Sequence, residues 1–190
     1  MYAVSRIGSG AYVTLAAAQC GHLRLLQHLH ENGFVWDEGT CAAASEEGHL
    51  DCLQYAYENG CLWDIKVFEG AARNGHLHCM RYAHQQGLEW SADVCWHAAK
   101  NGHLDCLEYA RDNSCPWDGA TTVYAAEQGR VHCLRYALEH GCPAGTYGCK
   151  RACKGGHLEC LQLLHQSGVP CDAAYNAYCA ARKPSIDCLQ

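Results

Sequence analysis

Apolar residues recur along this chain with a period of 27 residues. Each period opens with a glycine, and the third and sixth residues counted from that glycine are apolar in all six copies. The fifth and ninth places complete the apolar stripe of a helix of about ten residues. Equal intervals of this kind indicate an internal repeat, in which neighbouring copies bury one another's apolar faces. The six opening glycines are Gly21, Gly48, Gly75, Gly102, Gly129 and Gly156.

The first helix of each repeat carries signals at both of its ends. Asp51, Asp105 and Glu159 lie in the first turn, where a carboxylate suits the positive end of the helix dipole. A glycine suited to the left-handed residue after a helix follows five of the helices, and a serine follows the sixth. We therefore expect these helices to end at Gly33, Gly60, Gly87, Ser114, Gly141 and Gly168.

A second helix is expected after a short link that contains a tryptophan in four repeats. An aspartate or serine stands at one place of this link, where it is suited to cap a helix: Asp37, Asp64, Ser91, Asp118 and Asp172. Small residues then recur at helical spacing and predict an inward face that allows close packing. They are Cys41, Ala44 and Ser45, then Cys95, Ala98 and Ala99, then Cys149, Ala152 and Cys153.

Two antiparallel helices in each repeat predict an all-α solenoid. The stretch GHLDCLQYAYENGCLWD (48–64) resembles the outer helix of the ankyrin repeat, and DVCWHAAKNGH (93–103) resembles its inner helix. The six residues by which this repeat falls short of the ankyrin length of about 33 lie where the family has its β-turn finger. The resemblance, which covers residues 12–190, implies an ankyrin-like α-solenoid with shortened or absent β-turn fingers. Cysteine-rich repeats of this short type, with links such as SCPWD (114–118), are similar to those of large DNA viruses of amoebae.

We expect one repeat array over residues 1–190, without a second domain. Residues 12–20 match the second helix of the repeats that follow and are expected to form a lone inner helix that opens the array. Residues 183–190 match the beginning of a further, incomplete repeat. The complete repeats are 21–47, 48–74, 75–101, 102–128, 129–155 and 156–182.

Composition and charge narrow the functional classes. With 49% hydrophobic and 18% charged residues, the chain has the composition of a soluble folded protein. A net charge of −6 argues against a general nucleic-acid binder, which needs clustered lysines and arginines. No stretch reaches the roughly 20 apolar residues of a membrane helix. We expect an intracellular protein, cytoplasmic or nuclear and in the host cell if the source is a virus, whose cysteines are mostly thiols.

The chain contains 16 cysteines, and five of them occupy one place of the repeat. Equivalent helices in a stack lie about 8–10 Å apart, which exceeds the roughly 4.4–6.8 Å between the Cα atoms of a disulfide. These five cysteines are therefore predicted to pack as small hydrophobic residues.

Zinc binding is the alternative for a second group of cysteines. Cys149, Cys153 and His157 follow at helical spacing, with Cys142 and Cys160 nearby in sequence, and could supply ligands to one zinc ion. The same places are small and buried in the other repeats, so we expect no metal and no cofactor.

The histidine after the opening glycine recurs in five repeats, as His22, His49, His76, His103 and His157. Repetition favours a structural role, satisfying loop carbonyls at the turn between helices, over acid–base catalysis at one special site. The chain also lacks the sequence patterns of a nucleophile elbow, a Walker loop and a protein kinase. We therefore expect that the chain is not an enzyme.

The leading hypothesis for function is a scaffold that binds another protein, since solenoids offer extended binding surfaces. The alternatives are a zinc-dependent structural module and a truncated repeat fragment without a partner. We expect a monomer whose partner is a protein, without nucleic-acid or membrane binding. Outward-facing residues of the second helices are predicted to form the partner surface, with Trp96, Tyr124 and Arg151 as the preferred anchors. The full set is Glu69, Arg73, Trp96, Lys100, Tyr124, Glu127, Lys150, Arg151, Lys154 and Tyr178.

Overall fold

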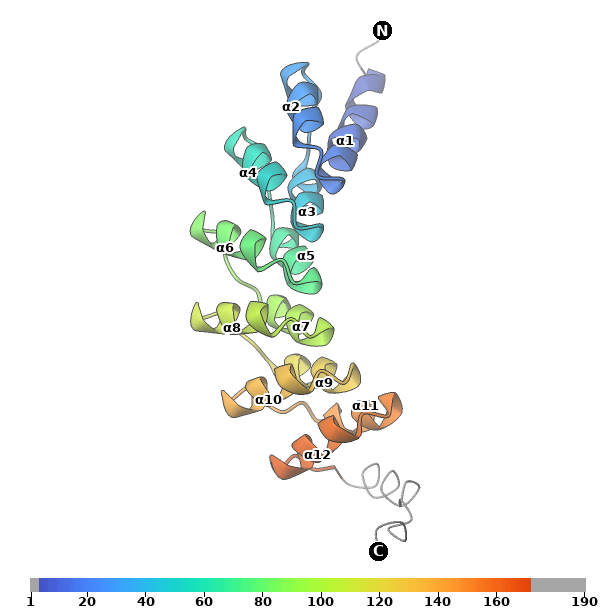
Figure 1. The fold of residues 1–190 in the computed structure, drawn as a ribbon, viewed down its shortest axis with the longest axis vertical. Helices are drawn as coiled ribbons and strands as arrows, with labels where there is room; N and C mark the ends of the chain where they lie inside the picture. The colour runs from blue at the N-terminus through green and yellow to red at the C-terminus, as the bar shows by residue number, and fades with distance from the viewer. Residues whose placement is uncertain (1–3, 172–190) are drawn as a thin grey trace, which may run out of the picture. The chain divides into compact units, whose positions relative to one another are not determined.

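The computed structural model describes residues 4–171, and their side chains from residue 10 onward. This range contains 12 α-helices and no strand, and none of these helices is long and apolar enough to span a membrane (Figure 1). The chain divides into two compact units. Unit 1 comprises Met1–Ala98 and Asp105–Pro116, and unit 2 comprises Ala99–Leu104 and Trp117–Gln190.

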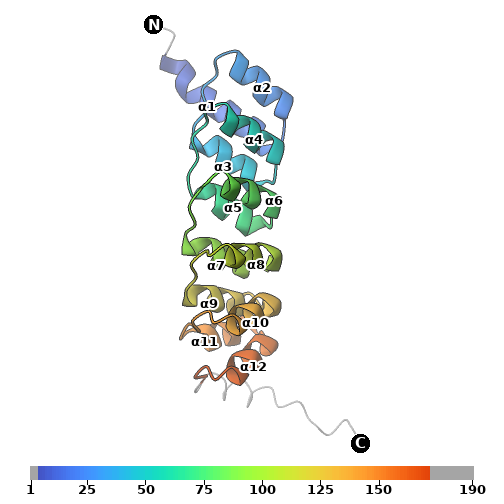
Figure 2. The ribbon, with the colours of Figure 1, turned by 90° about the vertical axis from the view of Figure 1, so that its left-hand side faces the viewer.

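Helices in unit 1 form two adjoining rows (Figure 1, Figure 2). The inner row contains α1 (Val4–Gln19), α3 (Glu38–Glu46) and α5 (Lys66–Asn74), and the outer row contains α2 (Leu23–Glu31), α4 (Leu50–Glu58) and α6 (Leu77–Gln85). Each inner helix packs on the next inner helix and on the outer helix that follows it. Most of α7 (Ala92–Asn101) and α8 (Leu104–Asp112) also belongs to unit 1.

Unit 2 repeats the same arrangement. Its inner helices are α9 (Gly119–Glu127) and α11 (Gly148–Gly155), which pack on each other. Its outer helices are α10 (Val131–Glu139) and α12 (Leu158–Gln166), which also pack on each other and on α9 and α11, respectively. The predicted order of two helices in each repeat is therefore observed in both units. The expected incomplete repeat at 183–190 lies outside the described residues.

The first helix is longer than the sequence predicts. α1 begins at Val4, whereas residue 12 was the expected start. Before α3 and α9 a tryptophan and a capping aspartate mark the start of the inner helix. No such link precedes residue 12, so the helical conformation continues toward the N-terminus.

The outer helices end as predicted, in the left-handed residue that follows them. Five of these residues are glycines, and Ser114 adopts the same conformation with φ of 64°. The amide of Cys115 then donates a hydrogen bond to the carbonyl of Ala110 at 2.9 Å, and the amide of Ser114 donates one to the carbonyl of Arg111 at 3.0 Å. This pair of bonds is the Schellman motif, which satisfies the last carbonyls of the helix.

Aspartates cap inner helices, but the predicted serine cap does not form. Asp37 accepts a hydrogen bond from the Gly39 amide at the start of α3, and Asp118 accepts one from Ala120 at the start of α9. Asp64 accepts one from the Lys66 amide, but the N-cap residue of α5 is Ile65, so Asp64 lies one residue before the cap and not at it. Ser91 directly precedes α7, yet its buried hydroxyl has no hydrogen-bond partner among the described residues. Asp172 lies outside the described range.

The cysteine column is confirmed as part of the core. All five of its members are buried to within 1% of complete burial: Cys52, Cys79, Cys106, Cys133 and Cys160. The small faces of the inner helices are buried as well, except that Cys153 is half-buried. Burial raises the pKa of Cys52 and Cys79 to about 12 and that of Cys160 to about 11, so these thiols stay protonated at neutral pH.

The repeated histidine packs against the opening glycine of the preceding repeat. A Cβ atom on Gly21 would lie 2.5 Å from Nδ1 of His49, and one on Gly129 would lie 2.5 Å from Nδ1 of His157. Real Cβ atoms do not approach this closely, so the ring occupies the space that glycine leaves. The pair of glycine and histidine thus recurs because the ring packs where glycine has no side chain, and the positive φ of these glycines is a second requirement. Hydrogen bonding of this histidine column to loop carbonyls stays a prediction.

Candidate interaction surface

Two of the predicted surface residues of unit 1, Arg73 and Trp96, are engaged in local contacts. Arg73 is exposed and forms an ion pair with Glu46, one repeat earlier, at 3.3 Å. Trp96 is half-buried, donates from Nε1 to the Asp93 carboxylate at 2.6 Å, and stacks on His97 with ring centroids 3.7 Å apart. Glu69 is half-buried. Trp96 is therefore held on its own helix, which weakens it as a binding anchor.

In unit 2 the predicted residues come together around Tyr124. The ammonium nitrogen of Lys100 lies 5.4 Å from the centre of the Tyr124 ring, and the guanidinium carbon of Arg151 lies 5.9 Å from it. Both distances are within the range of cation–π attraction. Arg151 also forms an ion pair with Glu127. Three inner helices, α7, α9 and α11, supply these four side chains.

A hollow of about 310 Å³ adjoins this group. Glu127, Tyr147, Lys150, Arg151 and Lys154 line it. Tyr147 is 65% exposed and directly precedes α11. Among the described residues no carboxylate pairs with Lys150 or Lys154, both of which are exposed. We call Lys100, Tyr124, Glu127, Tyr147, Lys150, Arg151 and Lys154 the basic cluster.

Tyr147 is the member of the basic cluster that the sequence prediction missed. The prediction considered only places within the second helix, and Tyr147 lies just before it. An aromatic residue where the earlier repeats carry Gly39, Lys66, Asp93 and Ala120 was the available signal. Tyr178, the last predicted member of the surface, lies outside the described residues.

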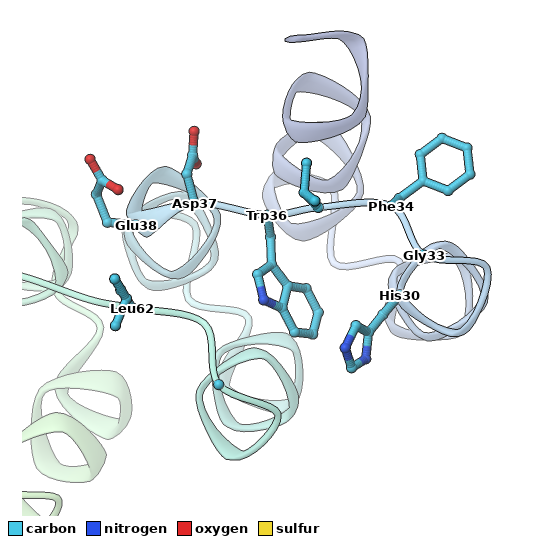
Figure 3. A pocket seen from close by; sticks show the side chains of 9 residues that line it. His30, Gly33, Phe34, Trp36, Asp37, Glu38 and Leu62 are labelled. Atoms are coloured by element: carbon cyan, nitrogen blue, oxygen red, sulfur yellow. The ribbon is translucent and has the colours of Figure 1, made fainter. Parts of the chain in front are cut away.

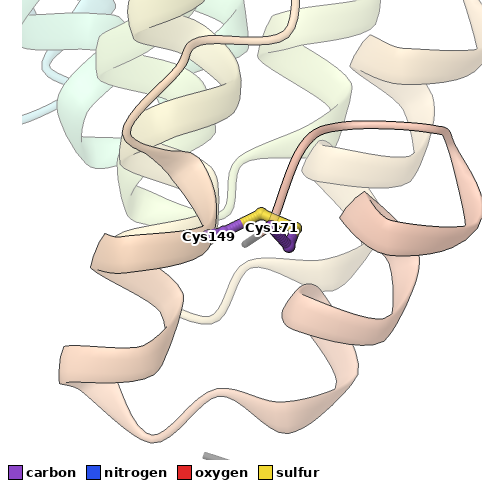
Figure 4. Close-up of a disulfide and its surroundings, with 2 residues drawn as sticks. All are labelled: Cys149 and Cys171. Carbon is purple, nitrogen blue, oxygen red and sulfur yellow. A yellow bond between two sulfur atoms is a disulfide. The ribbon is translucent and has the colours of Figure 1, made fainter. Parts of the chain in front are cut away.

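A disulfide between Cys149 and Cys171 fixes the end of α11 that carries the basic cluster (Figure 4). It joins the first turn of α11 to the segment after α12, with Cα atoms 5.4 Å apart. Lys150 and Arg151 follow Cys149 directly. The sequence prediction missed this bond, because Cys171 stands at the place of the link where four repeats have tryptophan. The other 12 described cysteines form no disulfide.

The disulfide also bears on the alternative of a zinc site. Cys149, the first of the proposed ligands, is bonded to Cys171. Within the part of the chain that the structure describes, no group of three or more potential ligands could hold a metal ion. That the protein binds no metal stays a prediction.

Unit 1 contains a larger hollow at the links, of about 580 Å³ (Figure 3). The His30 ring stacks on Trp36 at 4.0 Å, and its Nδ1 lies 3.0 Å from the Tyr55 hydroxyl. Val35 and Leu62 are 46% and 76% exposed at its rim. In the next two repeats Trp63 stacks on Tyr57 and Trp90 stacks on Phe68. Each of these three tryptophans also meets a tyrosine of the following repeat edge to face, and in this way it joins neighbouring repeats; the tyrosines are Tyr55, Tyr82 and Tyr109.

Asp37 and Glu38 belong to the same hollow but point away from the Trp36 ring (Figure 3). Asp37 is engaged in capping α3. The wall of the hollow around Trp36 is therefore apolar and aromatic, and the two carboxylates of its lining do not point toward this wall. Compared with the basic cluster, the hollow gives less indication of which kind of partner it would bind.

Comparison with known proteins identifies the fold. No protein-family model and no curated protein sequence matches this chain. Among solved structures, the crystal structure of the human ASB11 ankyrin repeat domain is similar with a TM-score of 0.70 and 19% sequence identity, over 90% of this chain and 98% of that one. A likeness at this identity shows the fold alone. The predicted all-helical, ankyrin-like solenoid fold is thus confirmed.

Proposed function

We propose that this chain, which has the fold of an ankyrin repeat domain, is a protein-binding scaffold whose partner contacts the inner helices of unit 2. Ankyrin repeat folds generally mediate protein–protein interaction. Repeat stacks present extended surfaces for this purpose. The finer proposal, that the partner uses the basic cluster, depends on the contacts around Tyr124.

The observation that carries the proposal is the contrast between the two faces of α9 and α11. The buried face is formed by small side chains such as Ala125 and Ala152. The other face presents the half-buried Tyr124 and Arg151 and the exposed Lys150, which are large polar or charged side chains outside the core. Tyrosine and arginine are enriched among the residues that dominate binding energy at interfaces. A surface of this composition is therefore suited to a protein partner.

The chemistry of the described side chains supports a binding role over catalysis. Glu127, the carboxylate of the basic cluster, is paired with Arg151 and is thus poorly placed to act as a base. Burial keeps Cys52, Cys79 and Cys160 protonated, and buried thiols of this kind are inert. We propose that the protein is not an enzyme, acts without a cofactor and works as a monomer.

The proposal includes an intracellular site of action, in the cytoplasm or the nucleus. The use of twelve described cysteines as thiols fits a reducing compartment, whereas the disulfide of Cys149 with Cys171 is more typical of an oxidising one. Resemblance of the short, cysteine-rich repeats to those of amoebal DNA viruses would place the protein in the host cell.

The test is a double substitution, Tyr124→Ala with Arg151→Ala, assayed against a partner recovered by proximity labelling. Binding should weaken by at least about tenfold, or about 1.4 kcal/mol, while the circular dichroism spectrum stays that of the parent. Arg135→Ala is the control, because Arg135 is exposed on the outer helix α10 of the same unit. Unchanged binding in the double variant would place the partner elsewhere and refute the proposal.

A further inference from the structure

The basic cluster has a positive net charge, whereas the chain as a whole has a negative one. The whole chain has a net charge of −6. The cluster contains four cations, Lys100, Lys150, Arg151 and Lys154, and one carboxylate, Glu127. The equivalent surface of unit 1 has no such excess, because the carboxylates of Glu46 and Glu69 outnumber the single cation Arg73 at the corresponding places. The positive charge is therefore a local property of unit 2 and not a general property of the repeat.

The cations of the cluster differ in how firmly they are held. Arg151 is oriented from two sides, by the ion pair with Glu127 and by the Tyr124 ring. Holding a guanidinium in this way reduces the entropy that is lost when it binds a ligand. Lys150 and Lys154 instead extend into solvent at the hollow, where the described residues provide no carboxylate to pair with them. The cluster thus combines one oriented hydrogen-bond donor, the Arg151 guanidinium, with two exposed ammonium groups, those of Lys150 and Lys154.

The hollow itself is small and aromatic at its edge. Its volume of about 310 Å³ is at the lower limit of small-ligand pockets and accommodates one or two side chains. Exposed Tyr147 supplies a ring and a hydroxyl at the rim. A chain segment lying across the hollow could place a carboxylate near Arg151 and further carboxylates near the lysines.

From this geometry we infer that the basic cluster binds an acidic linear segment of the partner protein, rich in aspartate or glutamate. The inference rests on the proposed function and names the class of partner. Complementary charge would also speed the encounter of the two proteins. Glu127 inside the cluster and the small number of cations disfavour nucleic acid, whose binding depends on neutralising many phosphates.

The test uses the full chain and a short fluorescein-labelled peptide of alternating glutamate and glycine, followed by fluorescence anisotropy. The same peptide with glutamine in place of glutamate is the ligand control. We expect the glutamate peptide to bind at least about tenfold more tightly than the glutamine peptide. Added sodium chloride should weaken its binding, because salt screens exposed charges.

Two charge reversals separate binding from folding. Lys154→Glu and Lys150→Glu should each weaken binding of the glutamate peptide by about tenfold. Lys150 lies in the first turn of α11, where a carboxylate interacts favourably with the helix dipole. The Lys150→Glu protein should therefore bind the glutamate peptide more weakly while its free energy of unfolding does not fall. Arg135→Glu changes the charge of unit 2 equally on an outer helix and should alter binding by less than about threefold.

Four results would overturn the inference. They are no binding of the glutamate peptide, equal binding of both peptides, equal losses in Lys154→Glu and Arg135→Glu, and tighter binding of a labelled thymidine oligonucleotide of the same charge. If one of them occurs while a recovered protein partner still depends on Tyr124 and Arg151, only the acidic class of partner is wrong. If that dependence is absent too, the proposed function also fails.

Discussion

Substitution of Gly129 by alanine tests the packing of the repeated histidine. Gly129 has φ of 68°, in the left-handed region, and an added Cβ would lie 2.5 Å from Nδ1 and 2.8 Å from Cε1 of His157. The ring cannot move away freely, because its opposite edge lies against Gly155, where a Cβ would be 2.5 Å from Cδ2. Gly129→Ala therefore combines backbone strain with overpacking.

The two costs can be separated within the same unit. Gly156 has φ of 74°, but an added Cβ would meet no atom within 4 Å. Alanine in the left-handed conformation costs roughly 1–2 kcal/mol, so Gly156→Ala should lower the free energy of unfolding by about that amount. Overpacking adds about 1–3 kcal/mol, so Gly129→Ala should cost about 2–5 kcal/mol.

Urea unfolding followed by circular dichroism at the helix band measures both variants. Replacement of His157 by alanine in the Gly129→Ala protein should recover the overpacking part, which a double-mutant cycle gives as a coupling energy of about 1–3 kcal/mol. Equal losses in Gly129→Ala and Gly156→Ala, within about 0.5 kcal/mol, would show that the histidine does not fill the space above Gly129.

Three further predictions concern other places in the repeat. Ser114→Gly should raise the free energy of unfolding by about 1 kcal/mol, because Ser114 has φ of 64° and glycine adopts this conformation without strain; a loss in urea unfolding would contradict this. Cys171→Ser should lower the free energy of unfolding by about 3 kcal/mol, the chain-entropy value for the sequence separation of 22 closed by the disulfide with Cys149. A reductant should lower the melting temperature of the parent by as much as the substitution does, and a variant whose melting temperature also falls with the reductant would contradict this. Burial, reinforced by the Asp51 carboxylate, raises the pKa of Cys52 from 9.0 to about 12, so above pH 9 the unfolded chain loses a proton that the folded chain keeps. The free energy of unfolding should therefore fall as the pH rises from 9 to 12, by up to about 1.4 kcal/mol per pH unit for this thiol; the fall between pH 9 and 10 should be smaller in Cys52→Ala, and an identical fall would contradict the assignment.

The helices were predictable because their determinants are local and repeated. The apolar places, the left-handed residue after each outer helix and the aspartates before the inner helices all act within a few residues. Ser91 shows the limit of this reasoning, since it has the right place for a cap but its hydroxyl makes no hydrogen bond among the described residues. α1 shows another, because no local signal marks where a helix without a preceding link begins.

The candidate site was predictable in part. Tyr124, Arg151 and Lys150 were identified from their places on the second helix, but the contacts among them depend on how successive helices are offset. Arg151 pairs with Glu127, which lies 24 residues earlier on the preceding inner helix, whereas Arg73 pairs with Glu46, which lies 27 residues earlier. The spacing of the repeat does not tell which of these two carboxylate positions an arginine will contact. The disulfide of Cys149 with Cys171 was missed because it joins two different places of the repeat, one of which carries tryptophan in four other repeats.

Photo-crosslinking within cells tests the central claim most directly. A photoreactive phenylalanine analogue replaces Tyr147, at the rim of the hollow, or Tyr12, which is 73% exposed on α1 of unit 1. A covalent adduct with a discrete protein should form from position 147 and not from position 12, and the Tyr124→Ala, Arg151→Ala double substitution should reduce its yield. Adducts that form equally from both positions, or whose yield is unchanged in the double variant, would contradict binding of a partner at the basic cluster.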